Sequence, residues 1–261
     1  MEKPTYTITF GNMGENHIGM QKIGIEIENG FNKAELDEAK TKFEEFGCDC
    51  VLYDLVDMSN VENAELILEK AYVLHIKNGV NKILESIGKT HHEAFIEQKD
   101  IVYDKKFWDR RRKKVLNKNA RYNSLFAQEQ QDADYENGKG TIIAFDDVPL
   151  LNKVRLDMSN FLGEKANDLI AEGNYYYDIK KCGIGYHGDT ERKIVIAYRL
   201  GERMPLVYQW YWKHKRIGDK MTFDIKSGDI YVMSEKAVGY DWKRSSIPTL
   251  RHSAGCDKYT K

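Results

Sequence analysis

Cysteine is scarce in this sequence, and the spacing of the few cysteines argues against two kinds of cross-linked site. The 261 residues contain four cysteines, at Cys48, Cys50, Cys182 and Cys256, and no two of them form a C-x-x-C pair. A disulfide framework or a zinc knuckle would need more cysteines or a regular pairing of them. We therefore expect four reduced thiols.

Long apolar runs are also missing. No uninterrupted apolar segment approaches the roughly 20 residues that a helix needs to cross a bilayer. The first residues, MEKPTYTITFGNMG, lack the charged-then-apolar pattern of a secretory signal. At 41% hydrophobic residues the chain can still form a full core. We expect a soluble intracellular protein, cytoplasmic or nuclear, with no membrane partner.

An excess of charge of one sign is absent as well. The chain has 40 basic and 41 acidic residues and a formal net charge of -1, so no global field attracts it to a polyanion. One segment, residues 105–121, nevertheless contains nine Lys and Arg residues, with Trp108 inside it and Tyr122 directly after it. Cations beside aromatic rings suit phosphate contact and base stacking. The alternative is a solvated helix face or loop, or a contact with another protein.

The first hundred residues alternate between helix and strand patterns. Residues 33–47 have apolar positions at helical spacing and a glycine at the end, where a helix cap is expected. CVLYDL and AYVLHI are short β-prone runs, and VNKILESI has a helical pattern. TIIAFDDV indicates another strand, and PLLNKVRLDMSNFLG a helix that begins with proline.

After residue 168 the pattern changes to short strands separated by Gly, Asp, Lys and Ser. Runs such as GIGYH, KIVIAYRLG, PLVYQWYW and GDIYVMS follow one another at regular spacing, which is typical of an antiparallel sandwich or barrel. We predict an α+β protein with a double-stranded β-helix, or jelly roll, in its C-terminal half. The predicted domains are an N-terminal α/β extension, residues 1–120, packed on an oxygenase core, residues 121–261.

Three residues of the strand-rich half form a candidate metal site. His187 and Asp189 lie two positions apart, so on a strand they face the same side, and a bend at Gly188 would let both reach one ion. His252, at the start of a later strand, supplies a third ligand. Two histidines and one carboxylate form the facial triad of non-haem Fe(II) oxygenases. The alternative is a pair of polar residues at an ordinary strand end.

Residues 140–255 resemble the AlkB family of Fe(II)- and 2-oxoglutarate-dependent dioxygenases. The resemblance rests on N-x-Y at Asn174 and Tyr176, on GIGYHGDTER followed by IVIAYRLG, and on VYQWY and GDIYVMS. It implies that His187, Asp189 and His252 hold iron and that Asn174 and Tyr176 line the 2-oxoglutarate site. By the same resemblance, Glu191 would orient a metal ligand or the substrate, and an exposed turn acid is the alternative.

The residue that binds the distal carboxylate of 2-oxoglutarate departs from the AlkB pattern. The R-x-N-x-T-x-R motif of that family does not follow His252 in this sequence, and residues 235–250 separate the G-D strand from the histidine. A buried carboxylate needs a cation, preferably arginine. We predict Arg199, which shares strand parity with the preceding inward positions. Lys258 and Arg251 are the rivals, although Arg251 should point away from the side of His252.

The resemblance implies oxidation of a substrate C–H bond with Fe(II), 2-oxoglutarate and O2, giving a hydroxylated or demethylated product. No catalytic residue beyond the metal ligands is predicted. The leading hypothesis for the substrate is a modified nucleobase in DNA, RNA or a nucleotide, guided by residues 105–121 and by Arg110, Arg111 and Arg112 within them. The alternative is a protein or peptide side-chain hydroxylase of the same superfamily. A third possibility is a jelly-roll binding domain without catalysis.

Overall fold

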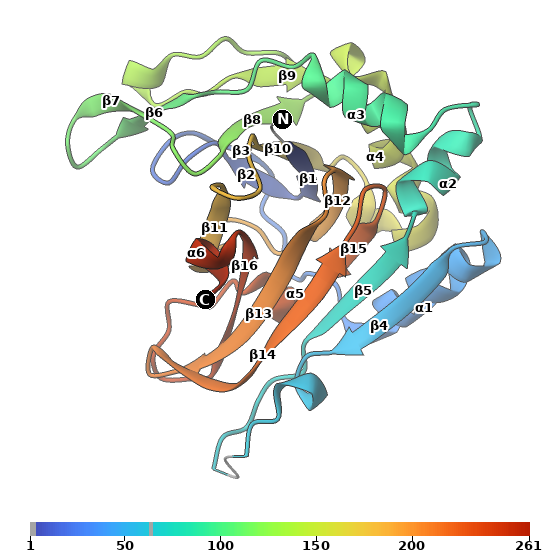
Figure 1. Cartoon of the computed structure of the whole chain (residues 1–261), viewed down its shortest axis with the longest axis vertical. Coiled ribbons are helices and arrows are strands. Elements are labelled where there is room, and N and C mark those ends of the chain that lie inside the picture. Colours follow the sequence, from blue (N-terminus) through green and yellow to red (C-terminus); the bar gives the residue numbers. More distant parts are fainter. Residues whose placement is uncertain (1–3, 63–64) are drawn as a thin grey trace.

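Two β-sheets organise the computed structural model, which describes residues 4–62 and 65–261 (Figure 1). The larger sheet has eight strands in the order β4-β5-β15-β12-β1-β10-β8-β9, and only the pair β8 and β9 is parallel. Its strands are β1 (Thr5–Gly11), β4 (Asp49–Asp54), β5 (Tyr72–Lys77), β8 (Tyr122–Ala127), β9 (Ile142–Ala144), β10 (Ile170–Tyr176), β12 (Val195–Gly201) and β15 (Ile230–Met233).

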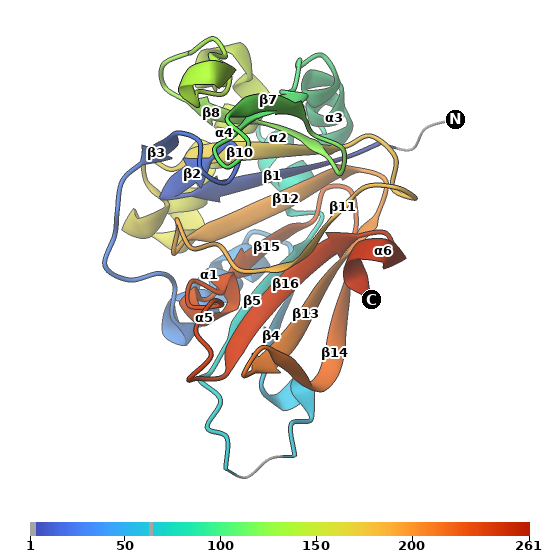
Figure 2. The same cartoon turned by 90° about the vertical axis from the view of Figure 1, so that its left-hand side faces the viewer.

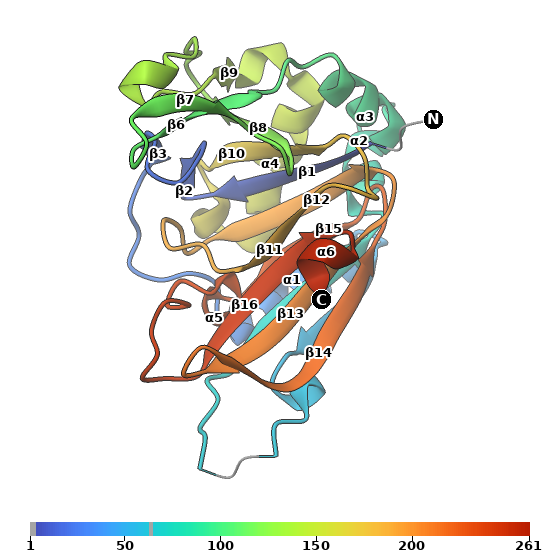
Figure 3. The same cartoon turned by 60° about the vertical axis from the view of Figure 1, so that its left-hand side comes forward.

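The smaller sheet has four antiparallel strands in the order β11-β16-β13-β14. They are β11 (Gly183–His187), β13 (Met204–Trp212), β14 (Lys215–Ile225) and β16 (Thr249–Gly255). Figures 2 and 3 show these strands together on one side of the larger sheet. Its inward side chains, among them Tyr208 and Trp210, share one buried core with Val195 and Ala197 of β12.

Helices cover the opposite face of the larger sheet (Figure 1). They are α1 (Lys33–Glu45), α2 (Gly79–Glu85), α3 (His91–Lys99) and α4 (Pro149–Leu162). Alternation along β12 separates the two cores, because Ile196, Tyr198 and Leu200 pack on the helix side. The protein therefore combines helices with mostly antiparallel strands, and the expected α+β class is confirmed in this coarse form.

Local sequence explains the helices and strands of the first half. Asn32 and Glu35 form a reciprocal capping box at the start of α1, and Thr90 and Glu93 form another at α3. The predicted helices at residues 33–47, 80–87 and 149–163 and the strands of CVLYDL and AYVLHI are present. The strand expected in TIIAFDDV is shorter, since the 3-10 turn η3 (Phe145–Asp147) leads directly into α4.

The basic segment is neither a helix nor an open loop. It forms a β-hairpin of β6 (Lys106–Asp109) and β7 (Lys114–Asn117), in which Trp108 faces Val115. The other short elements are β2 (Met13–Glu15), β3 (Lys22–Gly24), α5 (Glu235–Val238) and α6 (Asp257–Thr260), with 3-10 turns η1 (Asp57–Ser59), η2 (Tyr135–Asn137) and η4 (Glu164–Ala166).

The strand β1 joins the two halves of the chain. It hydrogen-bonds to β10 on one side and to β12 on the other, so that Thr7 lies opposite both Asn174 and Arg199. The larger sheet therefore contains strands from both sides of the predicted domain boundary, which lies between residues 120 and 121.

Two further expectations concern the chain as a whole. All four cysteines are free, with three of them buried and Cys256 half-buried. Among the described residues, no helix combines the length and the apolar character that crossing a membrane requires.

Residues 121–261 alone are expected to lack a cooperative thermal unfolding transition. This fragment contains β10 and β12 but not β1, so both strands lose a hydrogen-bonded neighbour, and the core loses Ile8 and Phe10, which are fully buried. Circular dichroism during heating, compared with the whole chain, measures this. A cooperative transition in the fragment would instead support an independent domain beginning at residue 121.

Candidate metal centre

Strand pairing brings the three predicted ligands together. His187 ends β11 and lies directly opposite His252 of β16, and the two ring centroids are 4.4 Å apart. Nε2 of His187 and Nε2 of His252 lie 3.5 Å and 3.9 Å from Oδ1 of Asp189. Ligand atoms at right angles around one ion, at bonds of about 2.1 Å, lie about 3 Å apart. Small side-chain movements would therefore let all three hold one ion.

The bend between His187 and Asp189 depends on glycine. A Cβ atom at Gly188 would lie 2.0 Å from the carbonyl oxygen of Gly239, which belongs to the turn after α5. The backbone N–H of Asp189 donates to the carbonyl of Val238 at 3.1 Å. The close approach of two backbones thus fixes the direction of the carboxylate.

Each imidazole has a ring nitrogen that could bind a metal ion. Nδ1 of His187 lies 2.8 Å from the carbonyl oxygen of Gly185, so Nδ1 carries the proton and Nε2 is available to a metal. His252 is buried. Burial, and then the neighbouring His187, hold the pKa of His252 well below its usual value. A neutral ring is the form that binds a metal.

A buried arginine supports the carboxylate from the other side. Arg192 pairs with Glu172 at 2.6 Å and with Glu191 at 2.8 Å, and its Nε lies 3.9 Å from Oδ2 of Asp189. Burial would raise the pKa of Glu172, but the Arg192 and Arg121 guanidiniums outweigh it and lower that pKa. Glu191 therefore lies in an ion-pair network beside the centre.

Arg199 lies on the face of the larger sheet that is turned toward the metal ligands. Its side chain is fully buried, and Nη1 donates to the carbonyl of Met204, while Nε and Nη2 have no hydrogen-bond partner. Residues directly opposite each other in a ladder point to the same side. Thr7 and Asn174 therefore lie in one row with Arg199, and the hydroxyl of Thr7 also lacks a partner.

Two tyrosines connect this row to the metal ligands, and the sequence analysis did not identify either. Tyr208 lies opposite His252, with ring centroids 5.8 Å apart, and its buried hydroxyl has no partner. Burial raises the pKa of Tyr231, while the nearby Arg199 charge acts to lower it. The inward alternation of GDIYVMS is the signal that could have indicated Tyr231.

The other predicted cosubstrate residues lie in different environments. Asn174 accepts from Nε of Arg121 at 2.5 Å and donates to Glu172 at 3.2 Å. Tyr176 is buried beside Met204, one row beyond Arg199. Lys258 is exposed on α6 and lies over the ring of Tyr259. Arg251 points away from His252, as its parity requires, and its guanidinium carbon lies 4.0 Å from the Tyr211 ring centroid.

The cations of residues 105–121 divide into two groups. Arg110, Arg111 and Arg112 are exposed in the hairpin turn, and Arg112 lies 4.0 Å from Asp109. Lys118 instead points inward and donates to Asn16 and Asn123, and burial lowers its pKa to about 8. Arg121 also points inward, toward Asn174. Two of the nine cations are thus used inside the protein.

Replacement of Gly188 by alanine should weaken divalent metal binding and lower stability. The new methyl group would displace the Gly239 turn, and overpacking of this kind costs about 1–3 kcal/mol. Gly185→Ala is the matched control, since a Cβ there meets no atom within 4 Å. Calorimetric titration with Co²⁺ and thermal melting measure both effects, and equal metal affinity in the two variants would contradict the role assigned to the bend.

Comparison with known proteins identifies one relationship. No family model matches the sequence. The chain is 43% identical over 260 residues to a protein of Acanthamoeba polyphaga mimivirus, the uncharacterized protein R156. The similarity covers 99% of this chain and 98% of that protein. On this identity over nearly the full length of both chains, the protein belongs to the same family as R156.

Proposed function

We propose that the protein is an Fe(II)- and 2-oxoglutarate-dependent dioxygenase. The observation that carries the proposal is that two groups face the core between the sheets from its two sides. On one side are His187, Asp189 and His252, whose ligand atoms all lie within 4.8 Å of one another. On the other is Arg199, a fully buried guanidinium that has the hydroxyl of Tyr231 beside it and forms no ion pair with a carboxylate of the described residues.

The proposed fold of this core is a double-stranded β-helix. In this interpretation β10, β12, β15 and the intervening β1 form one half, and the four strands of the smaller sheet form the other. The two histidines come from the smaller sheet, Asp189 comes from the loop that follows β11, and the proposed carboxylate-binding residue comes from the larger sheet. The early strand β1 takes the place between β10 and β12, which a strand from the end of the chain could otherwise fill.

The side chains fit the proposed metal and cosubstrate. Two imidazoles and one carboxylate are the donor set of a facial triad that leaves positions free on iron. Unpaired buried polar atoms are costly unless a ligand completes them, and those of the described residues include atoms of Arg199, Thr7 and Tyr208. A dicarboxylate bound between iron and Arg199 would satisfy these groups.

Each residue has a separate part in the proposed reaction. The iron, 2-oxoglutarate and O2 would together supply the oxidation of a substrate C–H bond. Arg199 would bind the distal carboxylate, with Asn174 and Tyr176 lining the same pocket. Arg192, whose Nε lies 3.9 Å from Oδ2 of Asp189, would hold that carboxylate in position, and the buried side chains of Leu206 and Tyr208 would exclude water from the cosubstrate side.

The proposed substrate is a modified nucleobase in DNA, RNA or a nucleotide. Five consecutive exposed cations, residues 110–114, favour a polyanion over a peptide, because phosphate contacts with Lys and Arg release counterions. The alternative, a protein or peptide side-chain hydroxylase, would use the same iron centre. Stimulation of succinate formation by methylated oligonucleotides or by peptides distinguishes the two.

Replacement of His252 by alanine should abolish stoichiometric iron binding and 2-oxoglutarate turnover while the protein still unfolds cooperatively. The substitution removes one of three ligands but leaves the β16 backbone in place. His214→Ala is the control, since His214 is exposed in the β13–β14 turn. Anaerobic iron titration and succinate formation are the measurements, and full turnover by the His252 variant would disprove this ligand set.

Replacement of Arg199 by methionine should raise the apparent constant for 2-oxoglutarate by a hundredfold or more, since loss of one partner of a buried ion pair costs about 3–5 kcal/mol. Without cosubstrate, the variant should be at least as stable as the wild type, because two unpaired buried nitrogens disappear. Thermal shifts with and without 2-oxoglutarate test both statements. A larger effect of Lys258→Ala would transfer the role to Lys258.

A further inference from the structure

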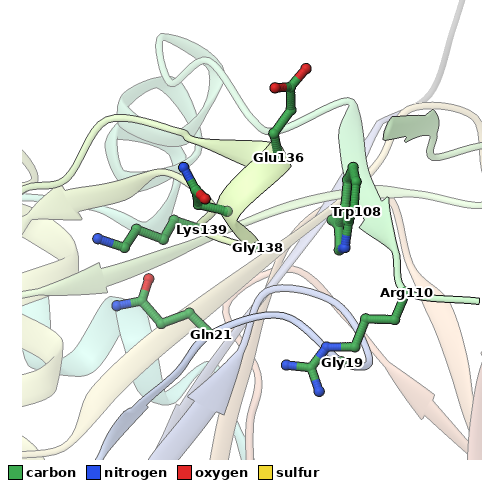
Figure 4. Close-up of a pocket in the computed structure, with 8 residues that line it drawn as sticks. Gly19, Gln21, Trp108, Arg110, Glu136, Gly138 and Lys139 are labelled. Carbon is green, nitrogen blue, oxygen red and sulfur yellow. The ribbon is translucent and has the colours of Figure 1, made fainter. Parts of the chain in front are cut away.

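A cavity of about 340 Å³ lies beside the basic hairpin and is separate from the proposed metal centre. It is open to solvent and is bordered by the β6–β7 hairpin, the segment between β2 and β3, and the turn at η2. Figure 4 shows Trp108 and Arg110 on one side of this cavity and Gln21 and Lys139 on the other. The lining residues are Gly19, Gln21, Trp108, Arg110, Glu136, Asn137, Gly138 and Lys139.

The lining combines a flat aromatic ring, two cations and two amides. The indole of Trp108 offers a stacking surface, and Arg110 and Lys139 offer positive charge against the single carboxylate of Glu136. The amide of Gln21 is held in one orientation, because its Oε1 accepts from Gln131 at 2.8 Å. A planar, hydrogen-bonding and anionic ligand fits this set, and a nucleotide has all three properties.

Two glycines keep the cavity open. Gly19 and Gly138 have φ angles of 86° and 71°, a region that side chains disfavour. The side chain of Arg110 lies against Gly19, where a Cβ would come within 3.1 Å of its Cδ. The volume falls at the lower end of the range for small-molecule sites, about 300–1,000 Å³, and so suits a single nucleotide unit.

The segment that forms the wall of this cavity also leads to the metal centre. The N–H of Gly19 donates to Oε1 of Glu15 at 2.7 Å. Burial raises the pKa of Glu15, and the charges of both Glu191 and Arg110 act on the same carboxylate. Glu191 in turn pairs with Arg192, whose Nε lies 3.9 Å from Asp189.

We propose that this cavity binds one nucleotide of a single-stranded nucleic acid. A modified base at another position of the same nucleic acid is oxidised at the metal centre. The inference rests on the proposed dioxygenase function and narrows the proposed substrate to a single-stranded nucleic acid. The base of the bound nucleotide stacks on Trp108, and Arg110 and Lys139 contact the phosphates on either side of it. A basic peptide is disfavoured, because the exposed cations of residues 110–114 would repel it.

Binding of a fluorescent 12-residue single-stranded oligonucleotide to the metal-free protein, followed by anisotropy at several salt concentrations, tests the proposal. Trp108→Ala should weaken binding by about 5- to 150-fold, the usual range for loss of one base stack. It should leave the slope of log affinity against log salt unchanged. Arg110→Ala should reduce that slope by about 0.7, the value for one phosphate contact on a single strand.

Matched variants separate stacking from general damage. Trp108→Phe should retain most of the affinity because a ring remains. Trp212→Ala should bind as the wild type does, although Trp212 also lies beside a lysine, 5.4 Å from Nζ of Lys213. Unchanged oligonucleotide affinity in both Trp108→Ala and Arg110→Ala would overturn the site. Tight binding of an arginine-rich peptide, if Glu136→Gln abolished that binding, would also overturn it.

The result is distinguishable from failure of the proposed function. The binding measurement needs neither iron nor 2-oxoglutarate, whereas turnover of 2-oxoglutarate without substrate needs both. Turnover with no Trp108-dependent oligonucleotide binding would overturn the cavity assignment alone. Trp108-dependent binding by a protein that neither binds iron nor turns over 2-oxoglutarate would leave a nucleic-acid site and overturn the dioxygenase.

Discussion

The double pairing of β1 is the constraint on which the rest of the structure depends. This strand hydrogen-bonds along its whole length to β10 and along most of it to β12, two strands that otherwise have no shared edge. Because opposite residues in a ladder point to the same side, the pairing places Asn174, Thr7 and Arg199 in one row. The polar groups that face the metal ligands are thus aligned by backbone hydrogen bonds.

Two buried arginines near this row differ in how their charge is compensated. Arg192 has Glu172 and Glu191 as close partners, and Asp189 lies slightly farther away. Arg199 has one backbone carbonyl and two unpaired nitrogens. Buried charges without partners are strongly unfavourable, and this is the physical reason for proposing an anionic ligand at Arg199. The ion pairs of Arg192 are complete within the protein, which suits a residue that positions Asp189.

Local patterns in the sequence predicted much of the candidate site but little of the topology. The predicted approach of His187 and Asp189 relied on strand alternation and a bend at Gly188. The structure brings their ligand atoms together, with Asp189 in the loop after β11 and not on the strand. The position of β1 depends on pairing with β10, whose paired residues lie 159 to 171 positions farther along the chain, and no local pattern encodes this. The inward turn of Lys118 depends on Asn16 and Asn123, which come from other elements. Residues 105–121 were therefore interpretable as a charged segment but not as a hairpin.

The segment after β1 connects the candidate metal centre with the proposed nucleotide cavity, and so would fix the distance between them. Oδ1 of Asn12 accepts from the backbone N–H groups of Lys193 and Ile194, close to the loop that carries Asp189. Asn16 is hydrogen-bonded to Asp104 and Lys118 at the base of the hairpin, and Gly19 forms part of the cavity wall. Residues 12–19 therefore contact, in turn, the segment next to the loop of Asp189, the base of the hairpin and the cavity. That stretch continues directly from the central strand β1. A nucleic acid bound at the cavity, as proposed, would therefore lie at a distance from the proposed iron site that the larger β-sheet determines.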